Sequence, residues 1–127
     1  MKIIYCAYGL AGLECLNQLI LNFSIKKTDL QIFTNKTPEN DDFIERLQNK
    51  IFNFTFENIN DCIQDIKKFN PNYLLSVYYW FVVGGKILNM VNKNAMHFPL
   101  FKGGLFEIDE KVIEINSADD LHNYFKK

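Results

Sequence analysis

The sequence predicts an open, doubly wound α/β fold with a mainly parallel sheet. Two observations predict it: short apolar runs that are typical of strands, and intervening stretches whose apolar residues recur at helical spacing. Elements that alternate in this way pack as helices against a parallel sheet. The chain has 127 residues, of which 48% are hydrophobic and 23% charged, so it is large enough to bury one such core.

The first and fourth expected strands are continuous apolar runs, the pattern of a strand that is buried on both faces. The five expected strands are segments 3–7, 29–35, 53–56, 73–79 and 95–98. The four expected helices are segments 10–23, 37–51, 59–69 and 86–91. Thr37-Pro38 opens the second helix, because proline is tolerated in a first helical turn, and Asn70-Pro71 ends the third.

The pattern changes after Gly104. Segment 105–116 predicts a hairpin with its turn at 109–111, although it lacks the favoured Asn-Gly or Asp-Gly turn. Ser117 then caps a last helix, with Asp120 in the position of an approximate capping box. We therefore expect residues 1–104 to form the α/β domain and residues 105–127 to pack on it as a hairpin and helix.

Composition and charge restrict the function classes. The formal net charge is −1 and basic residues are interspersed with acidic ones, so we expect no nucleic-acid partner. The longest apolar run, 73–83, is too short to span a bilayer, and no signal-peptide cleavage site follows the first apolar run. Cys6, Cys15 and Cys62 have no metal-ligand spacing. These features predict a soluble, cytoplasmic protein with reduced cysteines, no metal and no membrane partner.

The loop A-Y-G-L-A-G, residues 7–12, stands where a phosphate loop would stand after a first strand. Its glycines are three apart, so it is not a G-x-G-x-x-G motif. One interpretation is a tight strand-to-helix turn with close packing. The other is a helix N-terminus whose backbone amides bind an anionic ligand.

Two further features fall where strands are expected to end, the edge at which open α/β sheets bind ligands. Segment 79–83 is aromatic and apolar just where the fourth strand leaves the sheet, which suits either core packing or a flat heteroaromatic ligand. Asn94 and His97 form a polar pair that we place at the end of a buried strand. His97 is either a satisfied core histidine or a general base or electrostatic stabiliser.

Two segments carry a resemblance to a known family. They are K-I-I-Y-C-A-Y-G-L-A-G-L-E-C-L-N-Q-L, residues 2–19, and the stretch 69–104, which includes S-V-Y-Y-W-F and N-A-M-H-F-P. Together they resemble the N-terminal Rossmann-like domain of the formyltransferases, which include methionyl-tRNA, glycinamide ribonucleotide and sugar N-formyltransferases. The S-V-Y-Y stretch is most similar to the sugar enzymes.

The resemblance implies formyl transfer from 10-formyltetrahydrofolate to an amine, such as that of an amino-sugar nucleotide. It implies His97 and Asn94 as catalytic residues, and Tyr8, Gly9 and Lys102 as substrate-binding residues. The implied folate-binding residues are Tyr78, Tyr79, Trp80, Phe81, Val82 and Val83.

The sequence departs from the Asn-x-His motif of that family. If His97 is the family histidine, Ala95 stands in place of the asparagine; in the other register, Pro99 stands in place of the histidine. Lys102-Gly103-Gly104 replaces Arg-Gly, and no later aspartate has the family context.

Three hypotheses remain. The first is a compact formyltransferase that depends on His97. The second is a catalytically reduced homologue that binds folate or nucleotide, or pairs with a partner chain such as a second copy of itself. The third is a small Rossmann-like domain of another kind.

Overall fold

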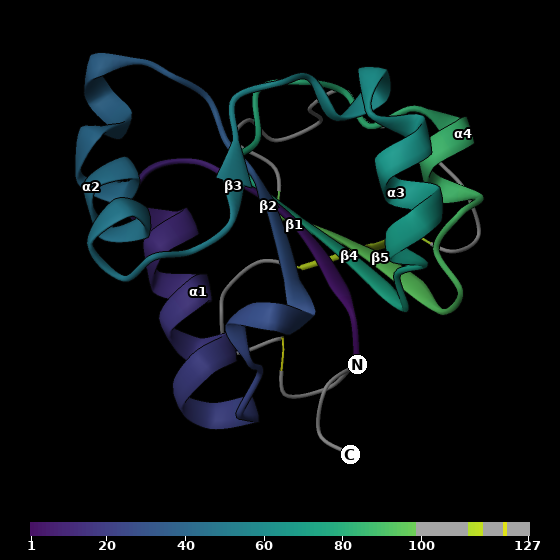
Figure 1. The fold of residues 1–127 in the computed structure, drawn as a ribbon, viewed down its shortest axis with the longest axis horizontal. Helices are drawn as coiled ribbons and strands as arrows, with labels where there is room; N and C mark the ends of the chain where they lie inside the picture. Colours follow the sequence, from purple (N-terminus) through teal and green to yellow (C-terminus); the bar gives the residue numbers. More distant parts are fainter. Residues whose placement is uncertain (99–111, 116–120, 122–127) are drawn as a thin grey trace.

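The computed structural model describes residues 1–98, 112–115 and 121, which form an α/β fold around one six-stranded parallel sheet (Figure 1). The strand order is β3-β2-β1-β4-β5-β6, and each neighbouring pair is parallel. The strands are β1 (Ile3–Ala7), β2 (Leu30–Phe33), β3 (Phe54–Thr55), β4 (Tyr73–Val77), β5 (Asn94–Phe98) and β6 (Val112–Glu114). The predicted mainly parallel, Rossmann-like α/β fold is confirmed, with the strand order reversing between β1 and β4.

Helices cover both faces of the sheet. In Figure 1, α1 and α2 lie on one side of the strands, and α3 and α4 on the other. The helices are α1 (Gly9–Phe23), α2 (Asp41–Asn49), α3 (Ile63–Phe69) and α4 (Gly85–Leu88). Three short 3₁₀ turns join them: η1 (Lys27–Asp29), η2 (Pro38–Asn40) and η3 (Ile59–Asp61).

The central strand β1 is fully buried because it serves two cores. Tyr5 packs with residues of α1 and α2, such as Leu16 and Phe43. Cys6, whose side chain points the opposite way, packs with residues of α3 and α4, such as Ile66 and Ile87. A strand that contacts apolar helices on both faces has no polar face, which is why its sequence is a continuous apolar run.

Helix α1 packs closely on the end of β1 because Gly12 has no side chain. A Cβ at Gly12 would lie 3.0 Å from the Cβ of Ala7 and 3.4 Å from its carbonyl carbon, which is tighter than ordinary contact. The buried Tyr5 hydroxyl donates a hydrogen bond to the Gly12 carbonyl oxygen. The interpretation of the loop 7–12 as a turn with close packing is therefore confirmed at Gly12.

Several element boundaries differ from the prediction. The expected helix 37–51 is divided into η2 and α2, because Asn40, the last residue of η2, has φ −100° and ψ 4°. The expected helix 59–69 is divided into η3 and α3 at Cys62 for the same kind of reason. Strand β4 ends at Val77, two residues early, because Tyr78 takes a positive φ of 59° and leaves the sheet.

The C-terminal strand β6 falls in the second arm of the expected hairpin, but its pairing differs from what a hairpin on its own would give. Strand β6 pairs in parallel with β5, as the edge of the sheet. The first arm and the turn of the expected hairpin, 105–111, lie outside the described residues, and so does the expected helix 117–127 apart from Leu121, which is buried. Within residues 1–98, 112–115 and 121, no helix combines the length and the apolar character needed to cross a membrane.

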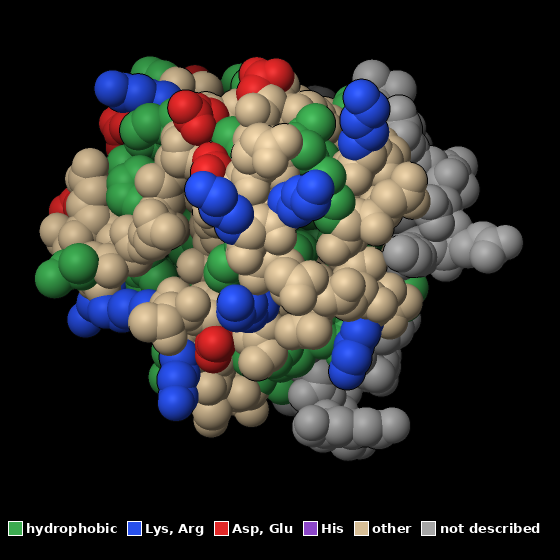
Figure 2. Space-filling model, turned by 45° about the vertical axis from the view of Figure 1, so that its right-hand side comes forward, with side chains coloured by type: hydrophobic (Ala, Val, Ile, Leu, Met, Phe, Trp, Pro, Cys, Tyr) green, Lys and Arg blue, Asp and Glu red, His purple; other side chains and the backbone are tan. Residues whose placement is uncertain are grey.

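The charges on the surface are dispersed. On the face shown in Figure 2, the Lys and Arg side chains stand apart from one another, with hydrophobic side chains visible between them. The interspersed charges of the sequence are therefore also dispersed on this face of the folded molecule.

Ile51 gives a first prediction about stability. It follows α2 in the left-handed region, φ 58°, with 84% of its surface exposed, and the N–H of Phe52 closes the helix end on the Leu47 carbonyl at 2.9 Å. Glycine is usual at this position, and a β-branched residue is strained there. Replacing Ile51 by glycine should raise the free energy of unfolding by about 1 kcal/mol, measured by urea titration.

Ile51→Ala is the matched control, because alanine removes the exposed apolar atoms but keeps a Cβ in the left-handed region. It should leave the free energy of unfolding within about 0.5 kcal/mol of the native value. A glycine variant that is less stable than the native protein would contradict the prediction.

Candidate functional site

The reversal of strand order brings two predicted segments together. The chain leaves β1 toward α1 on one face of the sheet, and leaves the neighbouring β4 toward α4 on the other face. Open α/β sheets bind ligands in the crevice that such a divergence creates at the carboxyl ends of the strands. Tyr8 and Gly9 follow β1 there, and the segment 78–83 follows β4.

The two segments meet through an aromatic pair, Tyr8 and Trp80. Their ring centroids are 4.7 Å apart, with an angle of 31° between the ring planes. Tyr8 is buried, and its hydroxyl shares a hydrogen bond of 2.8 Å with Thr37 Oγ1. Trp80 is 50% exposed, so one part of its indole rests on Tyr8 while the rest faces solvent. We call this pair the aromatic shelf.

Hydrogen bonds hold the loop that carries Trp80 at its first residue, Tyr78, and again near its end, at Val82 and Gly84. Tyr78, at φ 59°, donates its N–H to the Phe98 carbonyl oxygen at 2.9 Å, and its ring packs edge-on against the Phe98 ring. The Asn60 side chain donates to the Val82 carbonyl oxygen at 2.6 Å and accepts the Gly84 N–H at 2.8 Å. A bulky residue at positive φ costs free energy, and such strain persists where the surroundings determine the backbone and is common at functional sites.

The members of the predicted folate segment differ in exposure. Tyr79 and Val83 are buried in the core with α3 and α4, so they support the loop rather than line its surface. Burial raises the pKa of Tyr79, whose hydroxyl accepts the Ile59 N–H at 3.2 Å. Trp80, Phe81 and Val82 are the exposed members. Any ligand of this segment would therefore contact these three side chains first.

A buried polar cluster of Thr34, Asn35 and Asn40 holds the backbone next to both rings of the shelf. The Asn40 side-chain oxygen accepts the Gly9 N–H at 2.7 Å, and its NH₂ group donates to Thr34 Oγ1 at 2.8 Å and to the Asn35 carbonyl oxygen at 2.6 Å. Thr34 Oγ1 donates to the Ala7 carbonyl oxygen at 2.7 Å, and the Asn35 side chain accepts the Trp80 N–H at 3.1 Å. We call this the Asn40 cluster.

Sequence reasoning missed the Asn40 cluster. Its only signal was the polar stretch T-N-K-T-P-E-N, residues 34–40, which begins where β2 reaches the same edge of the sheet. A hydrogen bond from Asn40 to Gly9 joins residues 31 positions apart, which no local pattern reveals.

Gly9 is needed for its backbone conformation and leaves room beside it. Its φ is +71°, in the region that favours glycine. A Cβ built on Gly9 meets no atom of the described residues within 4 Å. Open space thus lies beside the Gly9 Cα, while the Gly9 N–H itself is bonded to Asn40.

The structure does not bring Asn94 and His97 together. Asn94 begins β5 opposite Tyr73, at the amino end of the sheet, whereas His97 stands opposite Ser76 near the carboxyl end. The two are three positions apart along the strand, which separates them by about 10 Å and places them on opposite faces. The expected polar pair at one strand end is thus corrected to a single polar residue, His97. Lys102 lies outside the described residues.

His97 forms part of a polar row across three strands. It pairs in register with Ser76 of β4 and with Glu114 of β6, so the three side chains share one face of the sheet. Burial lowers the pKa of His97 below its usual value of 6.5, and the Glu114 carboxylate opposes that shift. His97 is therefore a neutral base at neutral pH.

This environment predicts how His97 titrates. Its titration midpoint, followed by NMR of the imidazole protons, should lie below 6.5 and should fall further in Glu114→Gln, because the carboxylate that stabilises the cation is lost. The unfolded state then binds the proton more tightly than the native state. His97 therefore contributes stability above pH 6.5, and this contribution is lost as pH falls through the folded pKa.

The exposed Glu39→Gln provides the control for charge alone, and it should leave the His97 midpoint unchanged. A midpoint above 6.5 in the native protein would show that the Glu114 carboxylate, not burial, dominates.

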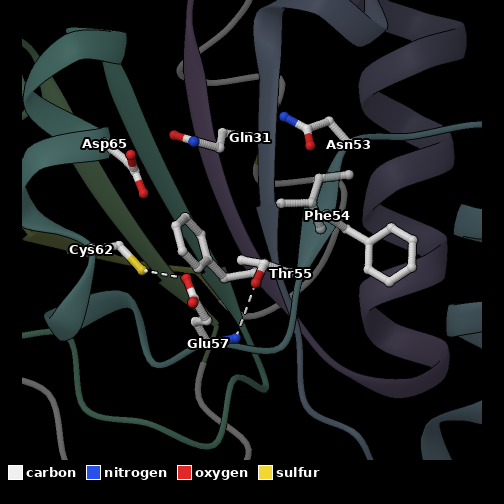
Figure 3. Close-up of a pocket in the computed structure, with 9 residues that line it drawn as sticks. Gln31, Asn53, Phe54, Thr55, Glu57, Cys62 and Asp65 are labelled. Carbon is white, nitrogen blue, oxygen red and sulfur yellow. Dashed lines mark hydrogen bonds between the residues drawn. The ribbon is translucent and has the colours of Figure 1, made fainter.

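A separate cavity of about 120 Å³ lies between α3 and the strands β2 and β3 (Figure 3). Cys62 Sγ donates to a Glu57 carboxylate oxygen at 3.3 Å, and the Glu57 N–H donates to Thr55 Oγ1 at 3.2 Å. The Gln31 side-chain oxygen is buried there and has no hydrogen-bond partner among the described residues. The cavity flanks the β2–β3 edge, not the crevice between β1 and β4.

Cys62 should react slowly with electrophiles. Burial first, and then the hydrogen bond to the Glu57 carboxylate, raise the pKa of its thiol to about 11. Only about one thiol in ten thousand is ionised at pH 7, and the thiolate is the nucleophile. Alkylation of the native protein by iodoacetamide should therefore be slow at pH 7, and Glu57→Gln should accelerate it at Cys62, as mapped by mass spectrometry. Equal rates in the two proteins would contradict this role of Glu57.

Neither the described side chains, as metal ligands, nor a matching sequence family supplies an assignment. Across residues 1–98, 112–115 and 121, no group of three or more His, Cys, Asp or Glu side chains could hold a metal ion. In comparisons with known proteins, no family model and no curated sequence matches the chain. The crevice between β1 and β4 is therefore the feature from which a function can be inferred.

Proposed function

We propose that the protein binds a planar heteroaromatic ligand against Trp80, in the crevice between β1 and β4. The observation that supports this most directly is the aromatic shelf. An indole that is 50% exposed stands at the reversal of strand order, supported from behind by the buried Tyr8 ring at 4.7 Å. Stacking of one aromatic base on such a side chain contributes about 1–3 kcal/mol to binding.

Preorganisation strengthens the proposal. The Trp80 backbone is tied to Asn35, and the following residues of the loop are tied to Asn60. A ligand would thus pay little conformational entropy to order the shelf. The open space beside the Gly9 Cα lies at the start of α1, next to Tyr8, so the crevice offers both an aromatic face and room beside it.

The resemblance to formyltransferases makes a folate the first ligand to consider, with 10-formyltetrahydrofolate as the form that donates a formyl group. Its tetrahydropterin keeps a planar, conjugated pyrimidinone ring, of a size that an indole can cover. Lys36 is exposed next to Asn35, with its Nζ 5.7 Å from the centroid of the Phe56 ring, and its cation would attract the carboxylates of a folate tail. These features fit the ligand without requiring any residue outside the described ones.

Formyl transfer to an amine, such as that of an amino-sugar nucleotide, is a second candidate. One observation favours it: His97 lies near the carboxyl end of β5 with a lowered pKa, so it can accept a proton from an attacking amine at neutral pH. Asn94 lies on the opposite face of the sheet, so it does not complete the site with His97. Binding therefore comes first in this proposal, and catalysis second.

The test is a titration with 5-formyltetrahydrofolate, a stable formyl-folate. Trp80 is the single tryptophan of the chain, so its fluorescence reports on the shelf alone. We expect saturable quenching together with a rise in melting temperature, because a ligand that binds only the native state stabilises it. The control is p-aminobenzoylglutamate, which has the tail of folate without the pterin and should have little effect.

No quenching and no melting shift up to millimolar folate would overturn the folate proposal. Catalysis is then tested apart from binding, by incubating the protein with 10-formyltetrahydrofolate and a panel of amines and looking for formylated product by mass spectrometry. Product that disappears in His97→Ala would support the enzyme; saturable binding with no product would identify a binding protein.

A further inference from the structure

We infer that the side-chain oxygen of Asn40 occupies the position that a phosphate oxygen would take at the start of α1. The crevice would then select heteroaromatic ligands that do not place a phosphate on the Gly9 amide. The identity of the ligand rests on the proposed function. The rejection of phosphate rests on the contacts of Asn40 and on the charges next to it, and it can be tested on the protein alone.

The fold by itself predicts the opposite. The turn after β1 leads directly into α1, a helix of 15 residues, in a sheet with the strand order 3-2-1-4-5-6. In sheets of this order, a dinucleotide usually places its pyrophosphate on the backbone amides of that turn. The free amides and the helix dipole provide the attraction.

Here the first amide of the helix already has an acceptor. The Gly9 N–H donates to the Asn40 side-chain oxygen at 2.7 Å, and the preceding amide, of Tyr8, donates to the Val77 carbonyl oxygen at 3.0 Å. Asn40 is fully buried. The carboxamide oxygen carries a partial negative charge and lies where an anionic oxygen would have to lie to reach Gly9.

A phosphate could not displace Asn40 without breaking the whole cluster. The Asn40 NH₂ group makes two further hydrogen bonds, of 2.8 Å to Thr34 Oγ1 and 2.6 Å to the Asn35 carbonyl oxygen. Each buried group left unpaired costs about 1–3 kcal/mol. Both contacts hold Asn40 in place, and Asn35 also holds Trp80, so displacement would disturb the shelf as well.

The charges next to the turn also oppose an anion. Asn40 lies between Glu39 of η2 and Asp41, the first residue of α2, and both of these acids are exposed. The groove beside Leu10, in the first turn of α1, is lined by Asp42 and Glu45 against a single Arg46. The side chains near the first turn of α1 thus carry more negative than positive charge, the reverse of a phosphate site.

The ligand class follows from these contacts. A dinucleotide or nucleoside diphosphate would need the Gly9 amide and would meet Asn40 instead. A pterin or another heteroaromatic ring needs only the face of Trp80 and the open space beside Gly9. Of the two ligand classes expected from the sequence, folate and nucleotide, Asn40 favours folate.

The experiment follows the backbone amides of the native protein by NMR during titration with inorganic pyrophosphate and with NAD⁺, at constant ionic strength. We expect the Gly9, Leu10 and Ala11 amide signals to stay in place with both probes up to several millimolar. The Gly9 amide should also exchange slowly with solvent, because it is bonded to Asn40. A saturable shift of these three signals by pyrophosphate would overturn the inference.

Two variants sharpen the test. Asn40→Ala frees the Gly9 N–H, so pyrophosphate should bind at least tenfold more tightly than to the native protein. Asn40→Asp keeps an acceptor opposite Gly9, so it should show no gain. Equal pyrophosphate binding by the two variants would also overturn the inference. If the amide spectrum shows that Asn40→Ala is unfolded, Asn40→Ser is used in its place.

The two proposals fail separately. If neither pyrophosphate nor 5-formyltetrahydrofolate affects the native protein, the proposed function is wrong and the role of Asn40 stands. If pyrophosphate moves the Gly9 signal while the folate still quenches Trp80, the role of Asn40 is wrong and the proposed function stands.

Discussion

Asn40→Ala should lower the free energy of unfolding by about 2–4 kcal/mol, because it removes three hydrogen bonds from a fully buried position. The Gly9 N–H and the Asn35 carbonyl oxygen would each lose a partner inside the protein. Both ends of the cluster belong to the site, since Gly9 starts α1 and Asn35 holds Trp80. Urea unfolding, followed by circular dichroism, gives the free-energy difference.

Asn49→Ala is the matched control. It makes the same chemical change at the exposed end of α2, where the free energy of unfolding should change by no more than about 0.5 kcal/mol. Thr34→Val adds a test of coupling, since Thr34 Oγ1 accepts from Asn40 and donates to Ala7. Because the two residues belong to one network, the effects of Asn40→Ala and Thr34→Val on the free energy of unfolding should not add. If Asn40→Ala lowers the free energy of unfolding by less than about 1 kcal/mol, the hydrogen bonds of Asn40 do not stabilise the protein as the structure implies.

The sheet could be predicted from the sequence because its central strands are buried on both faces. The runs of β1 and β4 have no polar residue that would suggest a surface, apart from the small Ser76. The exit of β4 could not be predicted, because Tyr78 takes a positive φ that its residue type disfavours. A strand was expected at β6, as the second arm of the hairpin, but its parallel pairing with β5 could not be predicted, because no local pattern reveals the neighbour of an edge strand.

The site was located by the sequence only as an edge of the sheet. The segments 7–12 and 79–83 were both expected there, but nothing local predicts that Tyr8 lies against Trp80. The same limit explains Asn94 and His97. Successive side chains of a strand point to opposite faces. Because β5 begins at Asn94, both Asn94 and His97 belong to the strand, and their odd spacing places them on opposite faces.

Formyltransferase-like chemistry therefore has weaker support in the described structure than binding does. The chain provides a neutral base, His97, within a row that also contains Ser76 and Glu114. It provides a preorganised aromatic face at a different strand, β4. A protein can keep the second feature without the first, because a stacking surface requires one ring in place, whereas group transfer requires several groups to converge on one atom.

Trp80→Ala should weaken binding of 5-formyltetrahydrofolate by about 5- to 150-fold, the loss that corresponds to 1–3 kcal/mol of stacking. Since the variant lacks the fluorescent reporter, affinity is measured by isothermal titration calorimetry. The stability of the protein should change little, because half of the Trp80 surface already faces solvent. The effect should therefore appear in the dissociation constant and not in the melting temperature of the free protein.

Two controls separate stacking from general damage. Trp80→Phe keeps a smaller aromatic face and should retain an intermediate affinity, while Leu21→Ala removes an apolar side chain that is 78% exposed near the far end of α1 and should bind like the native protein. If Trp80→Ala binds the folate with native affinity, the ring does not contact the ligand. The open space beside the Gly9 Cα, with Tyr8, would then be the part of the crevice to test next, since it does not depend on the indole.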